Sequence, residues 1–108
     1  MNLPANTMAI RACQMYGIGL QDLRGPSRLT ELCEARYALI VALREVGLSY
    51  PVIGRCINRN HSTMMHGHNR GLALCKTQMG FADIVGEIVD AAFPEATKAL
   101  KGPWSVAA

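Results

Sequence analysis

Glycine and proline divide this chain into segments of helix length, and none of these segments shows the sustained alternation of apolar and polar residues that a strand requires. At 108 residues the sequence is long enough for one modest core and too short for two. We therefore predict an all-α fold, a small multi-helix domain over residues 1–100. Residues 101–108, which contain Trp104, are expected to form a flexible tail.

Two predicted helices lie in the first half of the chain, and between them is a loop with Arg24 and Arg28, here called the basic loop. The first begins near Asn6 or Thr7, either of which can cap it, and runs to Gly17. The second is capped by Thr30 and ends before Gly47. Because its middle is apolar on most sides, we expect the second helix to be the buried centre of the fold.

A short helix, a tight turn and a longer helix follow. Ser49 caps the short helix, which has Pro51 in its first turn and ends near Cys56. Asn58 suits a left-handed turn, and Asn60 suits the cap of the next helix. Two helices joined by a few turn residues, the second opening with short polar side chains, are typical of the helix-turn-helix motif.

The last predicted helix covers residues 81–93 and carries a wide apolar stripe before Pro94 stops it. We expect this stripe to close the core. The alternative is a surface for a homodimer or another protein partner, since small helix-turn-helix proteins often bind paired half-sites. The stripe consists of Phe81, Ile84, Val85, Ile88, Val89 and Ala92.

Positive charge is concentrated in the first 75 residues and comes entirely from arginine. This part has eight arginines, no lysine and four acids, a net charge of +4, whereas residues 76–108 carry −1. Arginine forms paired hydrogen bonds with phosphate groups and guanine edges. The distribution suits a nucleic-acid partner, and a solvated arginine surface without a partner is the open alternative.

The sequence shows no membrane-spanning stretch and no secretion signal, since its longest apolar run covers only residues 38–43. We therefore expect a cytoplasmic protein. The four cysteines lie about twenty residues apart without a CxxC pair, which predicts reduced and mostly buried thiols.

The three histidines lie close together, between His61 and His68. A zinc site is unfavourable, because His61, His68 and Cys75 follow one helical stripe at intervals of two turns, about 10 Å. No complete catalytic set accompanies them, so we predict no metal, no cofactor and no enzymatic activity. We favour a role in DNA recognition for His61 and structural roles for His66 and His68.

If Asn60 caps its helix, then His61, Ser62 and Thr63 form the first turn and Arg59 lies just before it. In a helix-turn-helix protein this turn enters the major groove of DNA. Small hydroxyl groups and an imidazole can reach base edges there, and exposed amides face phosphate.

The stretch LSYPVIGRCINRNHSTMMHGHNR, residues 48–70, resembles the C-terminal DNA-binding domain of the bacterial replication initiator DnaA. The signature of that domain has the form S-L-P-E-I-G-x-x-F-G-G-R-D-H-T-T-V-x-H-A. The resemblance extends over residues 6–75 and, more weakly, over residues 81–93. The matching residues are Ser49, Pro51, Ile53, Gly54, Arg59, His61, Thr63 and His66.

The resemblance implies a fold like that of the Trp repressor and of the DnaA C-terminal domain. It implies that Asn60, His61, Ser62 and Thr63 read bases in the major groove of double-stranded DNA.

The resemblance also assigns roles to arginines. Phosphate contacts are implied for Arg59 and Arg70, and a minor-groove contact for Arg24 or Arg28 in the basic loop. The family's phosphate-contacting arginine at the start of the central helix is missing, and Arg36 is expected to substitute for it.

We therefore expect a sequence-specific DNA-binding protein that regulates or assists replication or transcription. It lacks the phosphate-binding loop G-x-x-x-x-G-K-[ST], so we expect no ATPase activity. The alternative is a protein-interaction module that keeps the fold, has lost DNA binding, and holds its partner through residues 81–93 or Trp104. A stand-alone domain of this kind also suits a phage or mobile element.

Overall fold

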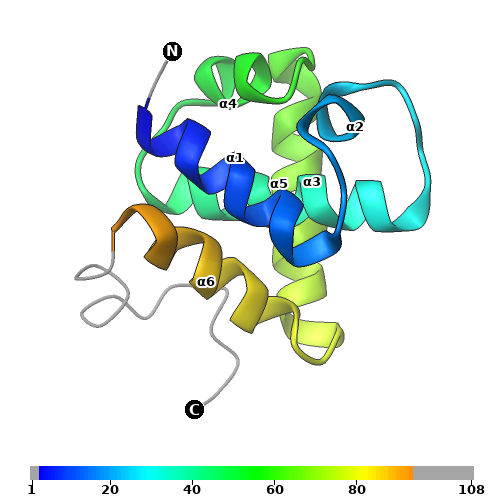
Figure 1. Cartoon of the computed structure of the whole chain (residues 1–108), viewed down its shortest axis with the longest axis vertical. Coiled ribbons are helices and arrows are strands. Elements are labelled where there is room, and N and C mark those ends of the chain that lie inside the picture. Colours follow the sequence, from blue (N-terminus) through cyan, green and yellow to red (C-terminus); the bar gives the residue numbers. More distant parts are fainter. Residues whose placement is uncertain (1–2, 94–108) are drawn as a thin grey trace.

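The computed structural model describes residues 3–93 and contains six helices and no strand in that range (Figure 1). The predicted all-α fold is confirmed. Trp104 and the predicted tail lie outside the described residues. The helices are α1 (Leu3–Tyr16), α2 (Leu20–Arg24), α3 (Thr30–Glu45), α4 (Tyr50–Cys56), α5 (His61–Thr77) and α6 (Phe81–Ala92).

Two helix starts differ from prediction. α1 begins at Leu3, so Asn6 and Thr7 lie inside the helix and not at its cap. A proline in the first turn explains the earlier start, because its fixed backbone angle suits that position. Thr30 is the first residue of α3, and Leu29 occupies the cap position without a side-chain hydrogen bond.

α3 is the buried centre of the molecule, as predicted. α1 and α6 pack against it, and α5 crosses it (Figure 1). Burying one large aliphatic side chain contributes about 1.5–3 kcal/mol relative to leaving it exposed, so this helix supplies a large part of the core energy. Its fully or almost fully buried residues include Ala35, Ala38, Leu39, Ile40, Val41, Ala42 and Leu43.

Two glycines allow α5 to cross α3 at close range. A Cβ atom at Gly67 would lie 2.7 Å from Cδ1 of Ile40. A Cβ atom at Gly71 would lie 2.9 Å from the carbonyl oxygen of Tyr37 and would also collide with Val41. This close crossing fixes the direction in which the opposite, exposed face of α5 points.

α6 closes the core against α1 and α3. Phe81, Val85, Ile88 and Val89 are buried, which confirms the predicted role of the apolar stripe.

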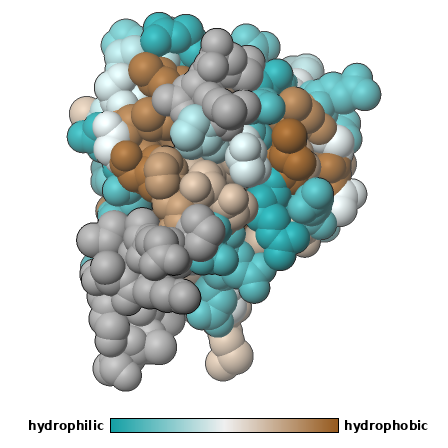
Figure 2. Space-filling model, turned by 60° about the vertical axis from the view of Figure 1, so that its left-hand side comes forward, coloured by the Kyte–Doolittle hydropathy of each residue, from teal (hydrophilic) through white to brown (hydrophobic). Residues whose placement is uncertain are grey.

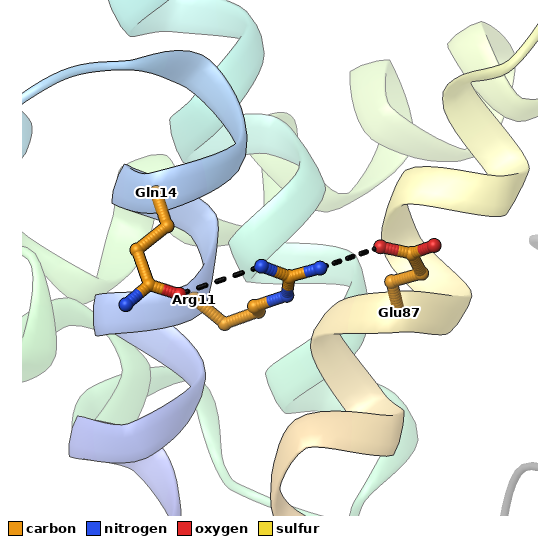
Figure 3. A network of polar contacts seen from close by, with 3 residues as sticks. All are labelled: Arg11, Gln14 and Glu87. Carbon is orange, nitrogen blue, oxygen red and sulfur yellow. Dashed lines mark hydrogen bonds and ion pairs between the residues drawn. The ribbon is translucent and has the colours of Figure 1, made fainter.

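A polar contact joins the outer faces of α1 and α6. The Arg11 guanidinium lies 2.9 Å from a carboxylate oxygen of Glu87 and donates a second hydrogen bond to Gln14 (Figure 3). Both charged side chains are about half exposed, so this pair adds little stability. The Glu87 carboxylate offsets the positive charge of Arg11, and this ion pair lies where α1 and α6 meet.

The cysteines are free thiols in this structure, as predicted. Cys13, Cys56 and Cys75 are buried and Cys33 is partly exposed. Burial, with a smaller effect of the nearby Glu45 carboxylate, raises the pKa of Cys75 to about 11, so this thiol is protonated at neutral pH. None of the helices in residues 3–93 is long and apolar enough to cross a membrane.

Candidate nucleic-acid interface

The turn between α4 and α5 is built by Asn58. Its φ of 57° lies in the left-handed region, as predicted, and the Arg59 N–H donates to the carbonyl oxygen of Gly54 at 2.8 Å. Asparagine is one of the few residues other than glycine that adopts this conformation readily. Ser49 occupies the predicted cap position of α4 with Pro51 in the first turn, but its side chain makes no cap hydrogen bond.

Gly54 sets the spacing between α4 and the start of α5. A Cβ atom on this residue would lie 2.6 Å from the carbonyl oxygen of Arg59 and 3.4 Å from the amide nitrogen of His61. Any side chain here would push the first turn of α5 away from α4. The helix-turn-helix geometry therefore depends on a glycine at this position.

The first turn of α5 is ordered by hydrogen bonds among its own side chains. Oδ1 of Asn60 accepts from the Ser62 amide at 3.1 Å and from the Ser62 hydroxyl at 3.2 Å, which confirms the predicted cap. The Thr63 hydroxyl donates to the Asn60 carbonyl oxygen at 2.8 Å. All three side chains, and that of His61 between them, are exposed.

The four residues predicted to read bases thus lie together on one exposed turn. The groups that can meet base edges are the His61 ring, the amide nitrogen of Asn60 and the hydroxyl lone pairs of Ser62 and Thr63.

The exposed face of α5 continues beyond its first turn. Met65 is 56% exposed, and His66, Asn69 and Arg70 are also exposed. Ser62, Met65 and Asn69 follow the helical spacing that places residues on one face. Met65 and Asn69 were not predicted as part of this face, although their helical spacing from Ser62 is visible in the sequence. His66, for which a structural role was expected, lies on the surface.

His68 has the expected structural position. Its Nδ1 atom lies 3.0 Å from the hydroxyl oxygen of Tyr50, so the ring links α5 to α4. The Arg44 guanidinium in turn lies over the Tyr50 ring, 4.3 Å from its centre. Burial and the Arg44 charge lower the pKa of His68, which favours the neutral ring.

The five arginines predicted to contact DNA fall into two groups. Arg28, on the loop between α2 and α3, and Arg70, on α5, are exposed. Arg24 is partly buried, and its Nε donates to the carbonyl oxygen of Cys56 at 2.8 Å. The structure thus ties the start of the basic loop to the end of α4.

Arg36 differs most from its expected role. It is only 6% exposed, and its guanidinium donates hydrogen bonds to backbone carbonyl oxygens of α2 and the following loop. The acceptors are Leu23 at 2.8 Å, Ser27 at 2.6 Å, Asp22 at 2.9 Å and Gly25 at 3.0 Å. A side chain buried and engaged in this way does not serve as a phosphate contact on the surface, because those donors are used inside the protein.

Arg59 is partly buried and also faces the loop. Its Nη1 donates to the carbonyl oxygens of Arg24, Ile57 and Asn58 at 3.2–3.3 Å. Its Nη2 donates to the carbonyl oxygen of Gly25. Arg59 therefore connects the basic loop with the turn that precedes α5.

A pocket of about 390 Å³ opens between the basic loop, α3 and the start of α5. Arg28, Arg59, Thr63 and His66 are among its lining residues, and none of the lining residues is acidic. The exposed Arg28 and the first turn of α5 therefore share an opening whose charged groups are all basic. Among residues 3–93 we find no group of three or more histidines, cysteines or carboxylates that could hold a metal ion.

Comparison with known proteins agrees with this geometry. A family model described as the bacterial dnaA protein helix-turn-helix matches residues 9–70. The chain is also similar to the chromosomal replication initiator protein DnaA of Mycobacteroides abscessus, with 33% identity over 67 residues. The match covers 61% of this chain and 13% of that protein, so the chain corresponds to a small part of its relative.

Proposed function

This chain belongs to the bacterial DnaA helix-turn-helix family, and on that premise we propose that it binds double-stranded DNA and recognises a specific base sequence. The observation that carries the proposal is the first turn of α5, where Asn60, His61, Ser62 and Thr63 are exposed and hydrogen bonds among Asn60, Ser62 and Thr63 hold the turn in place. Preordered side chains lose little entropy on binding, which favours specific contacts.

In the proposed complex the first turn of α5 enters the major groove. His61 and Asn60 form hydrogen bonds with base edges, as do the hydroxyl groups of Ser62 and Thr63, and the Thr63 methyl group contacts a thymine methyl group. Arg28 contacts the minor groove or a phosphate beside it, and Arg70 contacts a phosphate further along the strand.

Three predicted DNA contacts are revised in this proposal. The Nε atom of Arg24 and the guanidinium groups of Arg36 and Arg59 are bonded to backbone carbonyl oxygens. We therefore assign direct contact to Arg28 and Arg70, and a supporting role to the other three.

The biological setting is proposed from the relative, which is a chromosomal replication initiator. We propose that the chain acts in the cytoplasm as an accessory factor, competitor or regulator at DNA sites used in replication or transcription. It would do so without ATP hydrolysis, because the sequence contains no phosphate-binding loop of the G-x-x-x-x-G-K-[ST] type.

Selection from a library of random duplexes tests this proposal without assuming a site. The purified chain is expected to enrich one short motif over successive rounds, and His61→Ala is expected to enrich it less. Failure to enrich any motif, together with equal weak binding to all duplexes, would exclude sequence recognition. Equal binding to all duplexes would indicate an electrostatic interaction with the DNA backbone that does not depend on base sequence.

A protein-interaction module is the second candidate. Ile10, Met79 and Phe93 are 43%, 99% and 37% exposed. Figure 2 shows two groups of hydrophobic residues on one face of the molecule, with hydrophilic residues between them. The buried stripe of α6 is occupied by the core, so a dimer would have to use other residues. Sedimentation velocity over a hundredfold concentration range distinguishes a monomer from a homodimer.

A further inference from the structure

We infer that Arg36 and Arg59 are positioning residues that hold the loop between α2 and α3 against the helix-turn-helix. This contact makes Arg28 and the first turn of α5 one rigid surface. The inference rests on the proposed DNA binding for its functional meaning. Its structural part, that the two side chains order the loop, stands independently of DNA.

Arginine side chains bind the backbone of the end of α2 and of the loop that follows it. Four carbonyl oxygens between residues 22 and 27 accept hydrogen bonds from Arg36. Two carbonyl oxygens, those of Arg24 and Gly25, accept from Arg59. The backbone of residues 22–27 is therefore held by two guanidinium groups that come from elsewhere in the chain.

Carbonyl oxygens at this position suit a cation. The loop follows the end of α2, where helix carbonyl groups lack partners within the helix and carry partial negative charge. A guanidinium has five donors in a planar fork, so one side chain can bind several carbonyl groups at once. Lysine, with a single ammonium group, cannot reproduce this geometry.

The loop contacts the residues that lead directly into the first turn of α5. Arg59 precedes the cap residue Asn60, so the residue that binds the loop is adjacent in sequence to the residue that starts α5. Nε of Arg24 donates to the carbonyl oxygen of Cys56 at 2.8 Å, and Nδ2 of the Asn58 side chain donates to the carbonyl oxygen of Arg24 at 3.4 Å. These contacts fix the distance between Arg28 and α5.

The alternative role for Arg59 is direct contact with a phosphate, and the two roles predict different behaviour. A phosphate contact depends on positive charge, so a lysine would largely preserve it, and its loss lowers the salt dependence of binding by about one unit. A positioning arginine depends on geometry, so a lysine would fail. If Arg59 is a positioning residue, its replacement weakens DNA binding only because Arg28 is no longer held in place.

The first experiment uses the free protein. Amide hydrogen exchange of residue 25 and of residues 27–29 is measured in the wild type, Arg59→Lys, Arg59→Met and Arg55→Met. Arg55 is exposed on α4 and serves as a control for the loss of charge. We expect exchange in the loop to be at least about tenfold faster in both Arg59 variants and unchanged in Arg55→Met, because only the former lose the carbonyl contacts.

The second experiment measures DNA affinity and its salt dependence for Arg28→Ala, Arg59→Lys and the double variant. We expect each single variant to lower the salt dependence by about one unit, and the double variant to resemble Arg28→Ala alone. Circular dichroism identifies any variant that does not fold. If Arg59→Met unfolds, Arg59→Lys carries the comparison.

Two results would overturn the inference. One is loop exchange in Arg59→Lys that equals the wild-type rate. The other is Arg59→Lys with wild-type DNA affinity and salt dependence, or losses that add in the double variant, since either would show that Arg59 does not act through Arg28. If the wild type binds no DNA, the proposed function fails, and the exchange experiment still decides whether the arginines order the loop.

Discussion

At the scale of single residues, the side chains proposed to contact DNA differ from those that hold the protein backbone in place. His61 and Arg28 are exposed on the surface of the molecule, whereas Arg36 is buried and binds carbonyl groups. Asn60 combines both roles, because its side-chain oxygen caps α5 while its amide nitrogen remains on the surface. Substitutions at these positions should therefore separate stability from DNA affinity.

The cap predicts a stability effect at Asn60. Asn60→Ala removes the acceptor for the Ser62 amide, and we expect a loss of about 1 kcal/mol in the free energy of unfolding. Asn60→Asp keeps an acceptor and should lose much less. Urea denaturation followed by circular dichroism measures both, with His61→Ala as the neutral control. Equal stability of Asn60→Ala and the wild type would contradict the assigned cap.

His68 predicts a pH effect on stability. Its pKa in the folded protein is lowered from the ordinary 6.5 by burial and by Arg44, so the unfolded state binds its proton more readily. The stability that this group contributes is present above pH 6.5 and is lost as the pH falls through 6.5 toward the lower folded pKa.

The measurement is the denaturation midpoint in urea between pH 7.5 and 5.5. His68→Gln should reduce the decrease in stability on acidification, and His66→Gln, a change at an exposed position of the same helix, should leave it unchanged. An identical pH dependence in all three proteins would show that His68 does not contribute.

At the scale of elements, the distance between α4 and α5 depends on Gly54. Gly54→Ala places a methyl group 2.6 Å from the Arg59 carbonyl oxygen, so the turn must shift. We expect a loss of about 1–3 kcal/mol in unfolding free energy, as in other overpacked sites, and weaker DNA binding because α5 is displaced. Ala73→Gly on an exposed part of α5 is the control for a helix change away from the turn, with an expected cost of about 1 kcal/mol.

Thermal denaturation and DNA titration of the folded variants at low temperature provide the two measurements. A Gly54→Ala protein with wild-type stability and wild-type affinity would mean that the close contact relaxes without moving α5.

Sequence patterns predicted the elements that depend on local chemistry. The left-handed turn at Asn58 and the cap at Asn60 are set by residues within a few positions of each other, and both are confirmed. The cap at Thr30 was wrong, because the preceding loop places Leu29 in that position. Arg36 binds the carbonyl oxygen of Ser27 in that loop, a tertiary contact that a local sequence pattern does not show.

At the scale of the whole molecule, the orientation of the arginines depends on contacts between distant segments. Arg59 meets the carbonyl group of Gly25, 34 positions away in sequence, and Arg36 meets that of Asp22, 14 positions away. No periodicity in the sequence contains this information. Charge patterning therefore identified the basic part of the chain but did not show which guanidinium groups face solvent.

The close crossing of α5 over α3 also joins segments that are distant in sequence, and it predicts an effect of substitution at Gly71. Gly71→Ala places a methyl group against the Tyr37 carbonyl oxygen and the Val41 side chain, both in the central helix. We expect a loss of about 1–3 kcal/mol in unfolding free energy. Chemical denaturation measures it, and an unchanged midpoint would contradict the tight helix crossing.

The central claim is that the first turn of α5 reads DNA sequence, and its most direct test is a comparison of specificity. Fluorescence anisotropy measures the affinity of the wild type and His61→Ala for a selected duplex and for a scrambled duplex at two salt concentrations. We expect the wild type to prefer the selected duplex and His61→Ala to lose about 1–3 kcal/mol of that preference while keeping its fold and its salt dependence. Equal preference in both proteins would contradict the claim.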